Sequence, residues 1–307
     1  MGQNMHANWM RPSTYWHDEL TGALMAARNY IDSRLTSAGG YCAYRTDQVQ
    51  EPNLADTYHA LTSLRLLGEE GPRPGAENYL QAFAVRTHDL LALHYLVGAL
   101  YCLSASPLVS DETIKKIHNL QPVPINLLDA VDFSLTIQRA CLRAELLRRL
   151  GAPPDHRADI RRLLYLSDNA DTGFGTPPNV ADTEYFVRLC HACGLKAGSR
   201  GLYQFLLGIQ HPSLGFTISN QATTVNLDVV CSGLICCALL RAQVVYPDDI
   251  VDLVLACQLK DGSFARTPGA GGNLLYTHKA LQILVLLFQQ TWFSADAEQL
   301  AFHSLFP

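Results

Sequence analysis

The stretch Asp56-Thr-Tyr-His-Ala-Leu61 starts with an aspartate and continues as an apolar segment, and this pattern recurs along the chain. The repeats start about 33 to 50 residues apart. A period of that length is typical of stacked helix pairs rather than of one irregular core. The six segments start at Asp56, Asp89, Asp132, Asp182, Asp228 and, with tyrosine in the aspartate position, Tyr276.

Hydrophobic periodicity predicts helices along almost the whole chain and few strands. Strongly apolar helices alternate with helices that have one polar face, so we expect six inner and six outer helices in one domain, residues 1–307. A further helix at 294–305 is expected to cap the structure, and residues 1–15 to form an N-terminal arm. We predict the inner helices at about 54–68, 88–104, 127–150, 180–194, 225–242 and 273–290, and the outer ones at about 16–34, 76–87, 109–119, 154–166, 196–210 and 247–258.

Charge and composition exclude several classes of protein. The formal net charge is −5, and no block of basic residues appears, so we expect no nucleic-acid partner. Charged residues make up 17 % of the chain, against about 25 % in an average protein, which fits a helical protein with much buried surface.

The cysteines and the apolar stretches indicate the compartment. Nine cysteines, an odd number, lie mostly in apolar helical segments such as 230–237, which favours reduced, buried thiols in the cytoplasm. The N-terminus has no apolar signal region, and the longest apolar stretches are too short to span a bilayer. The sequence leaves open a contact with a membrane surface and the oligomeric state.

Three stretches carry a resemblance to a known superfamily. Residues 39–68, 172–194 and 257–284 each contain a glycine one or two positions before an aromatic residue and, further on, a helix with Asp-Thr or Tyr-Thr in its first turn. This pattern resembles the repeat of the terpenoid cyclases and protein prenyltransferases. The resemblance implies an all-α fold, an (α/α)6 toroid, whose central, aromatic-lined cavity holds an isoprenoid chain as the substrate.

One catalytic motif of that superfamily is present only in part. Proton-initiated (class II) terpene cyclases carry Asp-x-Asp-Asp-Thr, and the middle aspartate protonates an alkene. The corresponding stretches are Asn53-Leu-Ala55-Asp56-Thr57 and Asn179-Val-Ala181-Asp182-Thr183, so the middle acid is alanine in both. The resemblance therefore implies cyclisation of a prenyl chain without a metal or other cofactor, with Asp182 or Asp56 as the acid.

The aspartates also support an acid from the residues alone. If the inner helices are parallel, their N-terminal carboxylates meet at one rim, where repulsion and burial are expected to raise the pKa of at least one of them. The alternative is that each aspartate only caps its helix, a contribution of roughly 0.5–2 kcal/mol. The candidate acids are Asp182, Asp56, Asp228 and Asp132.

Aromatic and histidine side chains follow closely after the starts of the inner helices. Ring faces stabilise a carbocation through cation–π attraction, so we interpret these residues as a substrate-binding wall, with ordinary core packing as the alternative. The candidates are Tyr58, His59, Tyr95, Phe133, Tyr185, Phe186, Tyr276 and His278.

Two other hypotheses stay open. Protein prenyltransferases hold zinc with Asp-x-Cys and a histidine on the last two inner helices, and the resemblance offers Asp228, Cys231 and His278, with a spacing that is one residue off. Magnesium is a possible cofactor if the substrate is a diphosphate, and Asp168-Asn-Ala-Asp171 is an acidic stretch that could bind it, with an ordinary turn as the alternative. Ala55 and Ala181 favour a third hypothesis, a non-catalytic isoprenoid-binding or scaffold protein.

Overall fold

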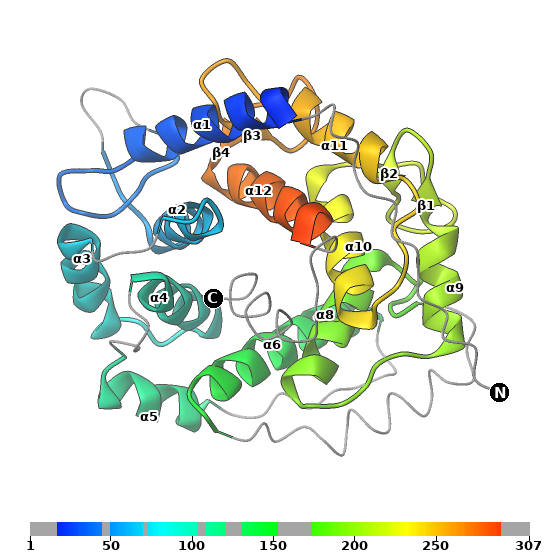
Figure 1. Ribbon diagram of the computed structural model, residues 1–307. Coiled ribbons are helices and arrows are strands. Elements are labelled where there is room, and N and C mark those ends of the chain that lie inside the picture. Colours follow the sequence, from blue (N-terminus) through cyan, green and yellow to red (C-terminus); the bar gives the residue numbers. More distant parts are fainter. Residues whose placement is uncertain are drawn as a thin grey trace.

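The inner helices form a closed ring, which confirms the predicted all-α toroid (Figure 1). The computed structural model describes residues 17–44, 50–69, 73–103, 109–120, 130–152 and 173–289. Each inner helix packs against the next along the chain, and the last packs against the first. The inner helices are α2 (Leu54–Leu66), α4 (Leu90–Leu103), α6 (Ala130–Arg149), α8 (Val180–Ala192), α10 (Leu227–Leu240) and α12 (Leu274–Gln289).

Outer helices with one apolar face surround this ring. Because only that face packs on the inner helices, the opposite face stays polar and solvated. The predicted outer helix at 154–166, the capping helix at 294–305 and the arm at 1–15 lie outside the described residues. The outer helices within them are α1 (His17–Ser33), α3 (Pro74–Ala84), α5 (Asp111–Asn119), α9 (Arg200–Gly208) and α11 (Pro247–Ala256).

The inner helices are buried on more than one side, and their composition explains this. Helices α4 and α10 consist mainly of Leu, Val, Ala and Cys, and most of their side chains are inaccessible to solvent. All nine cysteines are free and buried, as the sequence predicted. None of the helices in the described part of the chain is long and apolar enough to cross a membrane.

Two short hairpins connect outer to inner helices. Strands β1 (Gln210–His211) and β2 (Gly215–Phe216) pair antiparallel, as do β3 (Phe264–Ala265) and β4 (Gly272–Asn273). Gly262 has a φ of +88°, and a Cβ there would lie 2.1 Å from the Ala26 carbonyl oxygen of α1. Only glycine therefore lets this loop approach the outer helix so closely.

Four inner helices begin with the same asparagine cap. The Oδ1 atom of Asn53 accepts the N–H of Asp56 at 2.8 Å, and Asn179 does the same for Asp182 at 2.9 Å. This bond satisfies one of the backbone donors that a helix start leaves unpaired. The other two caps are Asn226 on α10 and Asn273 on α12.

A threonine next to this bond attaches the preceding loop. The Thr57 hydroxyl donates to the Asn53 carbonyl at 2.7 Å and accepts the N–H of Tyr41 at 3.0 Å. Thr183 and Thr277 repeat both bonds, with the N–H groups of Phe174 and Phe264. The glycine–aromatic loops thus fold under the helix starts, which gives the repeated Asp-Thr or Tyr-Thr pair a structural role.

Candidate functional site

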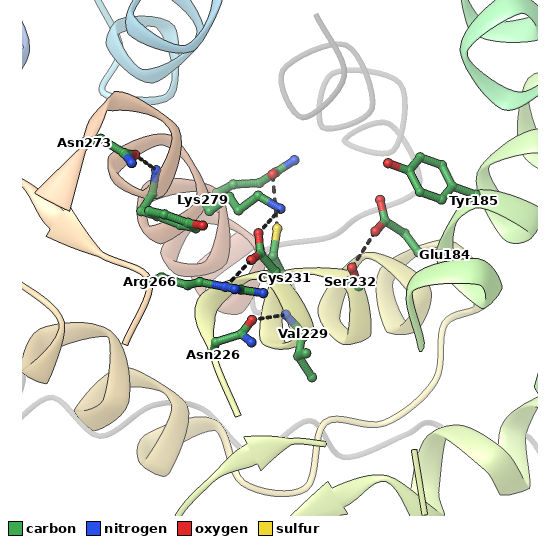
Figure 2. Close-up of polar contacts among 12 residues, drawn as sticks. Glu184, Tyr185, Asn226, Val229, Cys231, Ser232, Arg266, Asn273 and Lys279 are labelled. Carbon is green, nitrogen blue, oxygen red and sulfur yellow. Dashed lines mark hydrogen bonds and ion pairs between the residues drawn. The ribbon is translucent and has the colours of Figure 1, made fainter. Parts of the chain in front are cut away.

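The caps put five inner helices in a common register. In α4 the cap is Asp89, whose Oδ1 accepts the N–H groups of Leu91 and Ala92. The fifth and sixth residues after each cap contact residues of neighbouring inner helices. Figure 2 shows that Glu184, Tyr185, Cys231, Ser232 and Lys279 point toward the inside of the ring. We call these residues the lumen layer: Tyr58, His59, His94, Tyr95, Glu184, Tyr185, Cys231, Ser232, His278 and Lys279.

Five rings of the lumen layer meet on α2, α4 and α12. Tyr58 lies with its ring centroid 5.2 Å from Tyr95, 5.9 Å from His94 and 6.1 Å from His278. The rings of His59 and His278 are 5.4 Å apart. We call Tyr58, His59, His94, Tyr95 and His278 the ring cluster; four of its members are predicted substrate-binding residues, and His94 is new.

Burial keeps the ring cluster uncharged at neutral pH. It lowers the pKa of His94 to about 3, with a further contribution from the Arg149 charge, and that of His278 to about 3, with Lys279 adding to the effect. The pKa of His59 lies well below its usual value for the same reason. Burial raises the pKa of Tyr58 to about 12. The charged form of each group loses its hydration in this environment.

The other side of the ring holds buried charges. The Arg188 guanidinium binds Glu145 of α6 through two bonds of 2.9 and 2.8 Å and Glu184 of α8 at 2.8 Å. The Ser232 hydroxyl donates to Glu184 at 2.5 Å. Burial by itself raises the pKa of Glu145, but Arg188 outweighs it and lowers that pKa to about 2. We call Glu145, Glu184, Arg188 and Ser232 the charged cluster.

The residues proposed as zinc ligands do not form a metal site. The Asp228 carboxylate binds the Lys279 ammonium at 2.7 Å and the Arg266 guanidinium at 2.8 Å, as Figure 2 shows. The Cys231 thiol donates to Gln282 at 3.2 Å, and His278 belongs to the ring cluster. Within the described ranges, no three metal-ligating side chains are placed to hold one ion. A protonated lysine beside Asp228 disfavours a second cation there.

The aspartates whose side chains the structure describes are each held by hydrogen bonds or ion pairs, which agrees with the alternative that they support their helix starts. Oδ2 of Asp56 accepts bonds from the Asn53 amide at 2.5 Å and the Ala43 N–H at 2.8 Å. Oδ2 of Asp182 accepts bonds from the Asn179 amide and, at 2.7 Å, from the Ser134 hydroxyl of α6. Asp228 is ion-paired, and Asp89 is a cap. The side chain of Asp132 and the residues Asp168 and Asp171 lie outside the part described.

The remaining predicted aromatic residues lie apart from the ring cluster. The Tyr185 hydroxyl accepts a bond from Gln138 of α6 at 2.9 Å, on the side of the charged cluster. Phe186 stacks on Phe174 of the preceding loop with 3.5 Å between ring centroids, so it packs the loop rather than the lumen layer. Tyr276 occupies the aspartate position of its repeat and is half-buried, and Phe133 is buried in the hydrophobic core.

A pocket of about 480 Å³ lies at the opposite ends of α8 and α10. Its walls include His191 and Leu195 at the end of α8, Tyr203 of α9, and Leu240 and Arg241 at the end of α10. None of these residues belongs to the lumen layer. The pocket is therefore separate from the site built by the helix starts.

Comparison with protein families agrees with this architecture. The family model of the prenyltransferase alpha-alpha toroid domain matches residues 17–92 and 114–303. The chain belongs to this family. Its membership supports an isoprenoid-related enzyme in the broad sense. No individual curated protein matches the chain significantly.

Proposed function

We propose that this toroid protein cyclises a prenyl chain inside its ring and that Asp182 starts the reaction by protonating an alkene. The observation that carries this proposal is the position of Asp182. Its side chain is buried, with the residue 5 % exposed, yet it receives a hydroxyl from Ser134 on the neighbouring inner helix. Asp56, in the same position of its own repeat, is only half-buried and bonds within its own repeat. A carboxyl group can act as a general acid, and the Ser134 contact places this one between two inner helices, α6 and α8.

In the proposed step, the O–H bond of the Asp182 carboxyl group breaks and its proton forms a C–H bond with one alkene carbon. The other alkene carbon becomes a tertiary carbocation, which the electrons of the next alkene attack to close a ring. The final cation loses a proton to water, and a proton taken up from water restores the Asp182 carboxyl group, so the product is neutral and the reaction balances.

The side chains that follow Asp182 on α8 suit the cation. Tyr185 lies three residues further, which is the same face of a helix, and its ring provides a cation–π surface. Burial raises the pKa of Tyr185 to about 12, so its phenol stays neutral. The neighbouring Glu184 carboxylate is paired with Arg188, whose guanidinium lies 5.6 Å from the centre of the Tyr185 ring, so the cation would contact the other face of that ring.

The pair Asp182 and Asp56 provides a matched test. Both side chains bond to a cap asparagine in the same way, so Asp182→Asn and Asp56→Asn should have similar effects on stability. We expect Asp182→Asn to lower product formation from prenyl substrates at least 100-fold and Asp56→Asn to lower it less than 5-fold. Gas chromatography of the products, with circular dichroism as the folding control, measures both. Equal activity of the two variants would remove Asp182 as the acid.

A non-catalytic isoprenoid-binding protein is the second candidate. The observation in its favour is that both aspartates accept hydrogen bonds from their cap asparagines, which is a structural use of the Asp-Thr pair. This candidate predicts that the wild-type protein binds farnesyl and geranylgeranyl compounds but releases each of them unchanged. We do not propose zinc-dependent prenyl transfer, because Lys279 and Arg266 hold the carboxylate that would bind the metal.

A further inference from the structure

We infer that the ring cluster binds the uncharged, hydroxyl-bearing head of the ligand, and that its three imidazoles are the hydrogen-bonding partners of that hydroxyl. The inference rests on the proposed isoprenoid ligand but not on the cyclisation step. It assigns the two ends of the chain: the polar head lies at α2, α4 and α12, and the reacting end lies near Asp182 on α8.

The first observation is a set of three unsatisfied nitrogen atoms. The Nδ1 atoms of His59, His94 and His278 are buried and have no hydrogen-bond partner among the described residues. These three residues are 7 %, 5 % and 6 % exposed. Buried polar atoms in folded proteins are nearly always bonded, and an unbonded one is destabilising. Three such atoms in one cluster indicate a ligand that bonds to them.

The second observation is that three separate helices bring the imidazole rings of these histidines together. His59 comes from α2, His94 from α4 and His278 from α12, and each of the three rings contacts the Tyr58 ring. Gly98 makes room for that tyrosine, since a Cβ at Gly98 would lie 2.5 Å from its Cε2 atom. The arrangement therefore depends on glycine at one position and on the closed ring of helices.

The charge of the cluster selects the kind of head group. A phosphate or diphosphate is bound by cationic side chains, and the three imidazoles are neutral at physiological pH. A hydroxyl both donates and accepts, so it can bond to a neutral imidazole in either tautomer. An alcohol thus matches the cluster better than an anion.

The charged groups around the cluster have carboxylate neighbours. Lys279, beside His278 and His59, is bonded to Asp228. Arg188 is bonded to Glu145 and Glu184. Arg149 approaches the cluster at Gly98, and its Nη1 atom is buried without a hydrogen-bond partner among the described residues. Carboxylates therefore balance the charges of Lys279 and Arg188, whereas Arg149 interacts with the Glu145 charge without a direct bond to it.

The experiment measures the binding of farnesol, farnesyl diphosphate and the hydrocarbon farnesene to the purified full-length protein. We expect farnesol to bind more tightly than the diphosphate. Each of His59→Phe, His94→Phe and His278→Phe should weaken farnesol roughly 5- to 100-fold and leave farnesene within about 3-fold. His191→Phe is the matched control, because it removes an imidazole from the opposite end of α8, and it should leave farnesol binding unchanged.

Two further measurements separate ligand binding from a structural role. The phenylalanine variants remove an unsatisfied buried nitrogen, so the melting temperature of the ligand-free protein should rise, whereas loss of a structural hydrogen bond would lower it. In the wild-type protein, farnesol should shift the histidine nitrogen resonances in an NMR spectrum. This measurement does not depend on the folding of a variant.

Diphosphate binding as tight as that of farnesol, or histidine resonances that farnesol leaves unmoved, would overturn the inference. An absence of cyclised product would count against the proposed reaction alone, because these measurements need no turnover.

Discussion

The two sides of the ring bury their polar side chains in different ways. On α2, α4 and α12, the ring cluster stays neutral, because burial lowers the pKa values of its histidines and raises those of its tyrosines. On α6, α8 and α10, Arg188 pairs with two carboxylates of the charged cluster, and this pairing lowers the pKa of Glu145 to about 2. A neutral side with unsatisfied nitrogen atoms is suited to bind a ligand, whereas a fully paired charged side holds the helices in place.

The largest expected effect comes from breaking the charged side. Arg188→Met leaves Glu145 and Glu184 buried without their cation, so we expect the free energy of unfolding to fall by about 3–5 kcal/mol. Urea denaturation measures the loss. Adding Glu145→Gln removes one of the unpaired carboxylates and should restore part of the stability. A loss below about 1 kcal/mol in Arg188→Met would mean that these charges are solvated rather than buried.

Acid should affect the neutral side first. The histidine pKa values are lowered in the folded protein, so the unfolded protein binds more protons below pH 6.5, and stability falls as the pH drops from 6.5 towards 3. Glu145, with a pKa of about 2, contributes stability that is lost only below its ordinary value of 4.5. His278→Phe should remove about 2 kcal/mol of the loss between pH 6.5 and 5, by urea denaturation at each pH. Tyr95→Phe, in the same cluster, should not change that slope.

The packing of the neutral side is tested at Gly98. Gly98→Ala forces a methyl group against the Tyr58 ring, so we expect a destabilisation of about 1–3 kcal/mol together with weaker farnesol binding. Gly22→Ala is the control, because no atom lies within 4 Å of a Cβ at that position on α1, and the change should stabilise the helix by roughly 0.5–1 kcal/mol. Thermal melting of both variants decides whether Tyr58 needs the space.

The smallest effects should come from the caps, which both sides share. Asn53→Ala on the neutral side and Asn179→Ala on the charged side each remove one bond to a helix N–H, so each should cost about 1 kcal/mol in urea denaturation. Very different losses would show that the two sides differ in their backbone framework as well as in their side chains.

Much of the fold could be predicted from the sequence, because it depends on local signals. The apolar segment starting near Asp228 predicts a buried helix, and Asn226 with the N–H of Val229 gives it a cap. The alternation of apolar and polar-faced helices correctly predicted which helices are inner and which are outer, for all those that the structure describes.

The site was harder to predict. His94 lies in a segment that looks uniformly apolar, and only its place five residues after the cap at Asp89 could have indicated it. The pairing of Glu145 with Arg188 has no local signal, because the two residues lie on different helices. Spacing alone left open whether the aspartates act as acids or cap their helices, since it does not show that an asparagine and a neighbouring hydroxyl bond to Asp182.

By itself, the sequence determined the helices, their caps and the repeat that stacks them, because these depend on contacts between residues a few positions apart. Only the tertiary structure decided which side chains meet inside the ring. Tyr58 and His278 come from opposite ends of the chain and touch because α12 packs against α2. The separation of neutral from charged residues follows from that closure, since burial and pairing set the charge of each group only after the helices have assembled.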